Sequence, residues 1–121
     1  MAEGLDGRRV LVVEDEFLVA LDVEDALRDL GCEVLGPVPT VAEALALADP
    51  ARCDLAVLDV RLGVGSTAPL AAELRRRGIG FVVLTGYDRS QLAEPELRDA
   101  VVIGKPMQRS ALQRALLGLC A

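Results

Sequence analysis

Acidic, hydroxyl and amine side chains stand at or just after the ends of four apolar runs of this sequence. Glu14 and Asp15 follow one run, Asp59 follows another, and Thr85 and Lys105 follow two later ones. A carboxylate can act as the nucleophile that accepts a phosphoryl group, and phosphoryl transfer needs mainly positioning and neutralisation of charge. These residue types therefore suit phosphoryl transfer, provided that the fold gathers them in one place.

Three carboxylates gathered in one cleft would repel one another. At about 4 Å a like-charge pair costs on the order of 4 kcal/mol at an effective dielectric constant near 20. The single lysine cannot offset three negative charges, whereas Mg²⁺ binds one or two carboxylates and keeps several waters. The chain has no histidine and its three cysteines are spread along the sequence, which argues against zinc. We therefore expect Mg²⁺ as the cofactor.

Each polar residue has an expected role in such a site. Mg²⁺ would take one phosphoryl oxygen, Lys105 a second, and the Thr85 hydroxyl or nearby backbone N–H groups a third. Asp59 is the best candidate for the nucleophile because it stands alone after its apolar run and precedes a glycine-containing loop at residues 61–66. Glu14 and Asp15 are better placed as metal ligands.

The elements that must position these residues alternate between strand and helix. Runs that are apolar on every side are typical of parallel strands covered on both faces, and Thr40 begins a capping box with Glu43. The expected strands are residues 10–13, 33–38, 55–58, 81–84 and 101–103, and the expected helices are residues 19–30, 41–47, 68–77, 91–98 and 110–119. Pro95 interrupts the fourth helical pattern, which is the weakest. The alternation predicts an open parallel sheet with helices on both faces, whose ligands bind at the carboxyl ends of the strands.

Composition narrows the function further. A chain of 121 residues is expected to form one domain, and the net charge of −6 disfavours a nucleic-acid partner. The absence of histidine excludes a Ser-His or Cys-His nucleophile and phosphohistidine on this chain. No apolar run approaches the roughly 18 residues of a membrane span, and the first residues lack the basic and apolar regions of a secretory signal, so we expect none. Three cysteines without a Cys-x-x-Cys pair indicate free thiols in a reducing compartment, so we expect a cytoplasmic protein.

Four motifs together resemble the receiver domain of two-component response regulators. They are Val-Val-Glu-Asp at 12–15, Val-Leu-Asp at 57–59, Leu-Thr-Gly-Tyr at 84–87 and Lys-Pro at 105–106. Each motif is weak alone, but the four occur in the family's order and span essentially the whole chain. The resemblance implies an α/β, flavodoxin-like, doubly wound sheet of five parallel strands in the order 2-1-3-4-5 with five helices. It also implies a single receiver domain over residues 1–121 without an output domain.

The same resemblance assigns roles to the acidic residues. Asp59 would accept a phosphoryl group from a phosphohistidine of a sensor histidine kinase or phosphotransfer protein. Asp15 would bind Mg²⁺ directly, Glu14 would bind it mostly through water, and the backbone carbonyl of Arg61 would be a third protein ligand.

The resemblance also concerns the residues that report phosphorylation. Thr85 would move toward the phosphoryl group, and the lysine of a Lys105–Pro106 bond, expected to be cis, would pair with its oxygens. Many receivers carry Tyr or Phe where this chain has Val102. The Thr-Gly-Tyr motif is similar to that of receivers associated with HWE-type sensor kinases of alphaproteobacteria. We therefore expect Tyr87, or the loop at 86–92, to carry the switch.

The expected function is a phosphorylation-dependent signalling module that acts through protein contact, with a downstream protein or as a phosphorylation-dependent dimer. It would catalyse only its own phosphorylation and dephosphorylation. One alternative is a small phosphohydrolase with an aspartyl-phosphate intermediate, but such enzymes need a second acid where Arg61 stands. The other is a binding-only pseudo-receiver, against which the four complete motifs argue.

Overall fold

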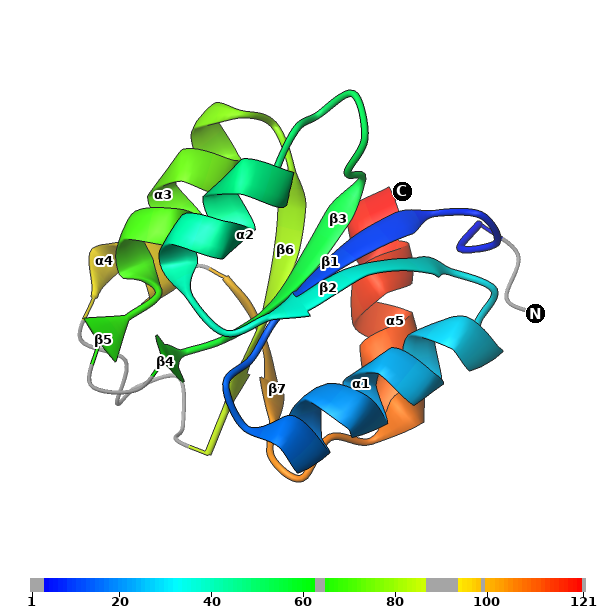
Figure 1. Ribbon diagram of the computed structural model, residues 1–121. Coiled ribbons are helices and arrows are strands. Elements are labelled where there is room, and N and C mark those ends of the chain that lie inside the picture. Colours follow the sequence, from blue (N-terminus) through cyan, green and yellow to red (C-terminus); the bar gives the residue numbers. More distant parts are fainter. Residues whose placement is uncertain (1–3, 63–64, 87–93, 99, 121) are drawn as a thin grey trace.

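The computed structural model describes residues 4–62, 65–86, 94–98 and 100–120, and a five-stranded parallel sheet forms its centre (Figure 1). In spatial order the strands are β2 (Glu33–Val38), β1 (Arg9–Val13), β3 (Leu55–Asp59), β6 (Gly80–Thr85) and β7 (Val101–Gly104). Counted along the chain, this is the order 2-1-3-4-5, so the predicted topology is confirmed. The labels skip two numbers because β4 (Arg61–Leu62) and β5 (Gly65–Ser66) form a separate antiparallel ribbon.

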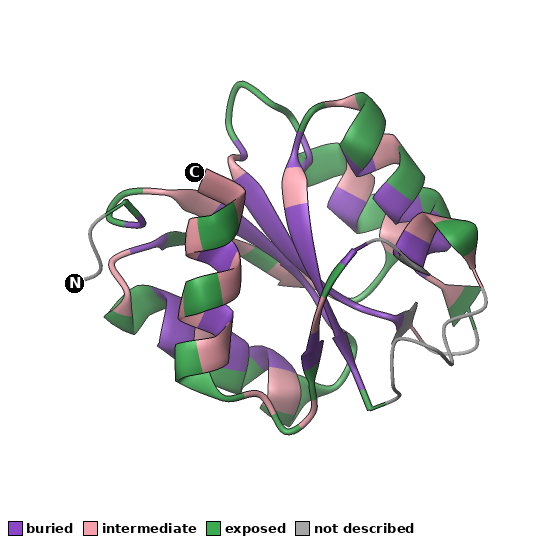
Figure 2. Ribbon diagram, turned by 180° about the vertical axis from the view of Figure 1, so that it is seen from behind, coloured by how far each residue is buried: buried purple, intermediate pink, exposed green. Residues whose placement is uncertain are grey.

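Helices cover both faces of the sheet. One face packs against α1 (Phe17–Asp29) and α5 (Arg109–Cys120). The other packs against α2 (Val41–Leu47), α3 (Ala68–Arg76) and α4 (Pro95–Arg98). Figure 2 shows the buried strands between these two layers. The doubly wound α/β fold predicted from the sequence is therefore confirmed. No helix in the described ranges is long and apolar enough to cross a bilayer.

Alternation along the strands explains why their sequences are apolar throughout. In β1, Val10 and Val12 contribute to the core under α1 and α5, whereas Leu11 and Val13 contribute to the core under α2 and α3. All four residues are at most 1% exposed. Successive side chains of a strand point to opposite faces, so a strand buried on both sides has no position for a polar residue. The polar side chains of this segment therefore lie on either side of the apolar run, with Arg9 before it and Glu14 and Asp15 after it.

Local signals fix the helix boundaries largely as predicted. Thr40 caps α2 by accepting a hydrogen bond from the Glu43 backbone N–H at 3.2 Å. Gly31, just after α1, has φ of 88°, a left-handed conformation that glycine adopts without steric cost. Gly31 thus ends α1 and Thr40 begins α2, and both lie in short connections next to β2.

Two expectations need correction. The segment 61–66, expected as a loop, contains the ribbon in which Arg61 pairs with Ser66. The helix expected at 91–98 begins at Pro95 in the structure, because proline lacks the N–H that a first-turn residue does not need. Pro95 therefore starts the helix rather than interrupting it, and residues 91–93 lie outside the described ranges.

Candidate functional site

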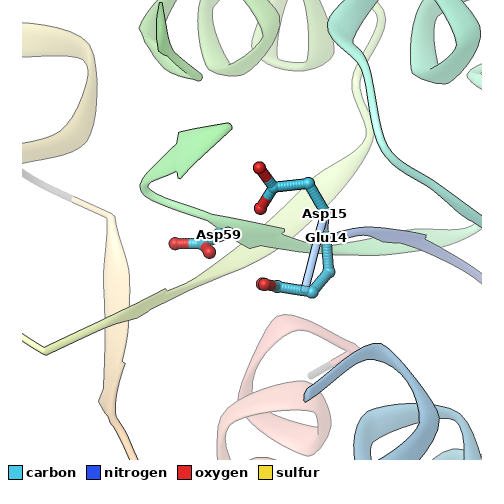
Figure 3. Close-up of side chains that lie close together, drawn as sticks. All are labelled: Glu14, Asp15 and Asp59. Atoms are coloured by element: carbon cyan, nitrogen blue, oxygen red, sulfur yellow. The ribbon is translucent and has the colours of Figure 1, made fainter. Parts of the chain in front are cut away.

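Three carboxylates converge at the carboxyl end of the sheet (Figure 3). Glu14 and Asp15 follow β1, and Asp59 ends β3. The two strands are parallel neighbours with Val13 opposite Leu58, so the residues that follow are brought side by side. One oxygen from each carboxylate lies within 4.8 Å of the others. The convergence expected from the sequence is confirmed.

Lys105 supplies positive charge to this cluster. Its Nζ lies 2.9 Å from Oδ2 of Asp59, to which it donates a hydrogen bond, and 3.9 Å from Oε2 of Glu14. Burial by itself would lower the pKa of Lys105, but the surrounding carboxylates raise it. The lysine therefore remains a cation, and Asp59 is the carboxylate that it pairs with most closely.

Thr85 and Lys105 are held together by the backbone. Thr85 ends β6 and is fully buried, and its carbonyl accepts a hydrogen bond from the Lys105 N–H at 2.9 Å. In the neighbouring strand pair, Asp59 of β3 lies opposite Leu84 of β6. The sheet register thus brings all five polar residues identified in the sequence to one edge.

Glu14 has the environment of a cation ligand. Its side chain is 1% exposed, and its Oε1 accepts a hydrogen bond from the Glu16 N–H at 3.2 Å. Its Oε2 is buried without a hydrogen-bond partner among the described residues. Burial, with the nearby Asp59 carboxylate, raises the pKa of Glu14 to about 8. A divalent cation would satisfy this oxygen and relieve the repulsion, so the residues present fit Mg²⁺.

Asp15 lies on the exposed side of the cluster. Asp15 is exposed, so an ion bound by the cluster could keep water ligands on that side, as Mg²⁺ requires. Arg61 lies in β4, two residues beyond Asp59. The role of its backbone carbonyl as a metal ligand stays a prediction.

Other expectations have mixed outcomes. The Lys105–Pro106 bond is cis, as expected. Val102, at the position where many receivers have an aromatic residue, is half-buried against the core under α3. Tyr87 and residues 87–92 of the expected switch loop lie outside the described ranges.

Two features of the site were missed by the sequence reasoning. Glu16 approaches Lys105, with its Oε1 3.9 Å from Nζ, and the sequence signal was a third acidic residue beside Glu14 and Asp15. The second feature is a groove of about 290 Å³ next to the cluster, whose lining includes Phe17 and Leu21 of α1. Phe17 is 76% exposed and Leu21 is 41% exposed, which is unusual for large apolar side chains this close together.

Comparison with known proteins gives consistent matches. A sequence model described as the response regulator receiver domain matches residues 10–117. The transcriptional regulatory protein PdtaR of Mycobacterium tuberculosis is 36% identical over 94 residues, which is 77% of this chain and 45% of that protein. The phyllosphere-induced regulator PhyR of Methylorubrum extorquens is 31% identical over 102 residues, 82% of this chain and 38% of that protein. The chain therefore spans less than half the length of either relative.

Solved structures agree with these sequence matches. The BeF3-activated conformation of SdrG from Pseudomonas melonis Fr1 superposes with a TM-score of 0.79 at 39% identity. That match covers 93% of this chain and 96% of SdrG.

Proposed function

Because this chain belongs to the response regulator receiver domain family, a family of phosphoacceptors in two-component systems, we propose that Asp59 is the residue that is phosphorylated. The 2.9 Å contact between Asp59 Oδ2 and Lys105 Nζ carries this proposal. Asp59 is only 5% exposed, lies on the central strand β3, and has both acidic and basic side chains close to it. It is also the nucleophile that the sequence pattern favoured.

Glu14, Asp15 and Asp59 are the residues that would hold Mg²⁺, together with the backbone carbonyl of Arg61. When bound, Mg²⁺ supplies neutralisation of negative charge on the phosphoryl oxygens. The buried, unpartnered Oε2 of Glu14 supports this assignment. Glu14 would act mostly through water and Asp15 directly, as in the family.

The residues of this chain then perform the transfer. A carboxylate oxygen of Asp59 forms a bond to phosphorus while the phosphorus–nitrogen bond of the donor phosphohistidine breaks, and the electron pair of that bond stays on the imidazole. The Lys105 ammonium moves its hydrogen bond from Asp59 to a phosphoryl oxygen. The Thr85 hydroxyl donates a hydrogen bond to another phosphoryl oxygen. The movement of Thr85 then transmits the phosphorylation state to the surface of the domain.

The proposed activity is limited to phosphorylation and dephosphorylation of the domain itself. A phosphohydrolase that acts on a separate metabolite is not favoured, because Arg61 occupies the position where such enzymes carry a second acid. A binding-only pseudo-receiver is not favoured either, because the acidic cluster and Lys105 are both present. We place the protein in the cytoplasm, and the three free cysteines suit a reducing compartment.

The proposed donor is a sensor histidine kinase, of the HWE type that the Thr-Gly-Tyr motif suggests, or a phosphotransfer protein. The exposed apolar side chains of Phe17 and Leu21 support a protein donor, because they line a groove that also includes Glu14 and Asp15. A donor helix packed there would bring its phosphohistidine to Asp59. The proposed output is a change of protein contacts, with a downstream protein or a second copy of the chain.

Mass spectrometry after incubation with acetyl phosphate and Mg²⁺ tests the assignment of Asp59. We expect one added phosphoryl group on the wild-type chain and none on Asp59→Asn. Asp25→Asn, which removes the same charge from an exposed position of α1, is the matched control and should be phosphorylated. Phosphorylation of Asp59→Asn to the wild-type extent would overturn the proposal.

A further inference from the structure

Glu16 is an acidic residue at the entrance to the site. It begins α1, but its side chain does not cap that helix. It is the N-cap residue of α1, where its carbonyl accepts the Ala20 N–H at 2.9 Å. Its side chain makes no capping hydrogen bond, although acidic groups are favourable at helix N-termini. Instead, its Oε1 lies 3.9 Å from Nζ of Lys105.

Lys105 is therefore shared among three carboxylates that differ in exposure. The Asp59 and Glu14 side chains are 6% and 1% exposed, whereas the Glu16 side chain is 65% exposed. The buried pair is fixed by the ends of β1 and β3, but Glu16 reaches the ammonium from the solvent side. A phosphoryl group arriving at Asp59 must also approach from that side and needs the same ammonium group.

We propose that Glu16 is a positioning residue that competes with the incoming phosphoryl group for Lys105 and thereby slows phosphorylation by small anionic donors. This inference rests on the proposed role of Asp59 as phosphoacceptor. With acetyl phosphate as donor, an Asp59 oxygen bonds to phosphorus, the bond between phosphorus and the acetyl oxygen breaks, and acetate leaves with the electron pair. During this step the ammonium group of Lys105 has to move its hydrogen bond from Asp59 to a phosphoryl oxygen, and it does so against the attraction of the Glu16 carboxylate.

Two effects of Glu16 act in the same direction. Its carboxylate holds the lysine away from the phosphoryl oxygens, and its negative charge repels a dianionic donor at the entrance. A protein donor gains binding energy from its docking surface, which a small molecule lacks. Glu16 thus favours phosphorylation by a docked protein over phosphorylation by free acyl phosphates.

The test compares Glu16→Gln with Asp25→Asn, which removes the same charge from an exposed position of the same helix. Initial rates with acetyl phosphate are measured at saturating Mg²⁺ and low ionic strength. Glu16→Gln should accelerate phosphorylation by about threefold to fivefold, the upper end of the effect expected for one exposed charge contact. Asp25→Asn should stay within about twofold of the wild type, and the melting temperatures of both variants should match it.

A double-mutant cycle shows whether Glu16 acts through the lysine. In a Lys105→Met background, Glu16→Gln should give a clearly smaller acceleration than in the wild-type background. Equal acceleration in the two backgrounds would overturn competition for Lys105. Wild-type phosphorylation with no difference between Glu16→Gln and Asp25→Asn would overturn the role of Glu16 alone. Absence of wild-type phosphorylation would instead overturn the proposed function.

Discussion

Glu14 and Asp59 belong to one acidic cluster but have different partners. Asp59 pairs with Lys105 at 2.9 Å, so its charge is largely balanced within the protein. Glu14 is buried, and the lysine is 3.9 Å away from its Oε2, a distance without a hydrogen bond. Within the protein the site therefore has one well-paired carboxylate and a second whose ionised form is disfavoured. A cation would stabilise the folded protein most through Glu14 and its neighbour Asp15.

Addition of Mg²⁺ should raise the melting temperature, because the ion binds the folded cluster and not the unfolded chain. At a Mg²⁺ concentration about tenfold above its dissociation constant, the gain in unfolding free energy is about 1.4 kcal/mol. Differential scanning fluorimetry with a Mg²⁺ titration measures it. Asp15→Asn should lose most of this gain, whereas Asp25→Asn, an equal change of charge outside the cluster, should keep it. The same shift in Asp15→Asn as in the wild type would contradict the assignment.

The ends of β1 and β3 opposite the acidic cluster are joined by a charged pair. Asp54, just before β3, accepts hydrogen bonds from the Arg9 guanidinium at 3.0 and 3.1 Å and from the Arg9 backbone N–H at 2.8 Å. The Asp54 N–H in turn donates to the Arg9 carbonyl at 2.8 Å. This pairing helps to set the register of β1 against β3. A contact at the far end of the two strands therefore helps to align Asp59 with Glu14.

Asp54→Asn should lower the stability at neutral pH and make stability less sensitive to acid. The hydrogen bonds from Arg9 lower the pKa of Asp54 below its ordinary value of 3.8. A lowered pKa stabilises the fold above the ordinary value, and this contribution is lost as pH falls through the lowered one. Urea unfolding at pH 7 and at pH 3 measures the difference between variant and wild type. A difference that does not shrink at the lower pH would contradict this account.

Gly36 marks a close approach of two strands at the edge of the sheet. It lies in β2 with φ of 90°, and a Cβ atom there would be 2.8 Å from the backbone nitrogen of Val38 and 3.0 Å from the Val12 carbonyl oxygen. Only glycine fits this position without movement of β1 or β2.

Gly36→Ala should reduce the unfolding free energy by about 2 to 4 kcal/mol, from the left-handed conformation together with the backbone clash. Gly78→Ala is the matched control. Gly78 also has a positive φ, of 75°, but a Cβ atom added there would meet no atom within 4 Å. This substitution should cost only about 1 to 2 kcal/mol. Equal losses in urea denaturation would show that the close approach to Val12 and Val38 is not restrictive.

At the scale of the whole molecule, the acidic cluster and the exposed end of α1 form one continuous face. The groove that includes Phe17 and Leu21 also includes Glu14 and Asp15, so a partner that packs on α1 would lie against the acidic cluster. Leu47 on α2 has a comparable exposed fraction, 37% against 41% for Leu21, but belongs to the layer on the opposite face of the sheet (Figure 1).

Leu21→Ser should therefore slow phosphotransfer from a histidine kinase that phosphorylates the wild-type chain. The expected decrease is about tenfold, the effect of removing a binding hot spot. The rate with acetyl phosphate, which needs no docking surface, should change by less than about twofold. Leu47→Ser should leave both rates close to those of the wild type. A parallel loss with kinase and acetyl phosphate would show damage to the site rather than to docking.

The topology and the main polar residues of the site could be predicted from the amino-acid sequence. Continuous apolar runs identify strands buried on both faces, and parallel strands must present their carboxyl ends at one edge. Asp15, Asp59 and Lys105 could therefore be placed together although they are far apart in the chain. The predictions were weaker where the pattern was short or ambiguous, as in the ribbon at 61–66 and the helix that starts at Pro95.

Which charged groups lie close enough to interact could be read only from the folded structure. The 3.9 Å approach of Glu16 to Lys105 joins residues on α1 and after β7, and it depends on helix placement and side-chain rotamer, which hydrophobic periodicity does not specify. The same holds for the exposed groove along α1, because the helical pattern identifies an apolar face but not the part of it left uncovered. Periodicity encodes which side chains are buried, whereas distances between charged groups arise from the packing of whole elements.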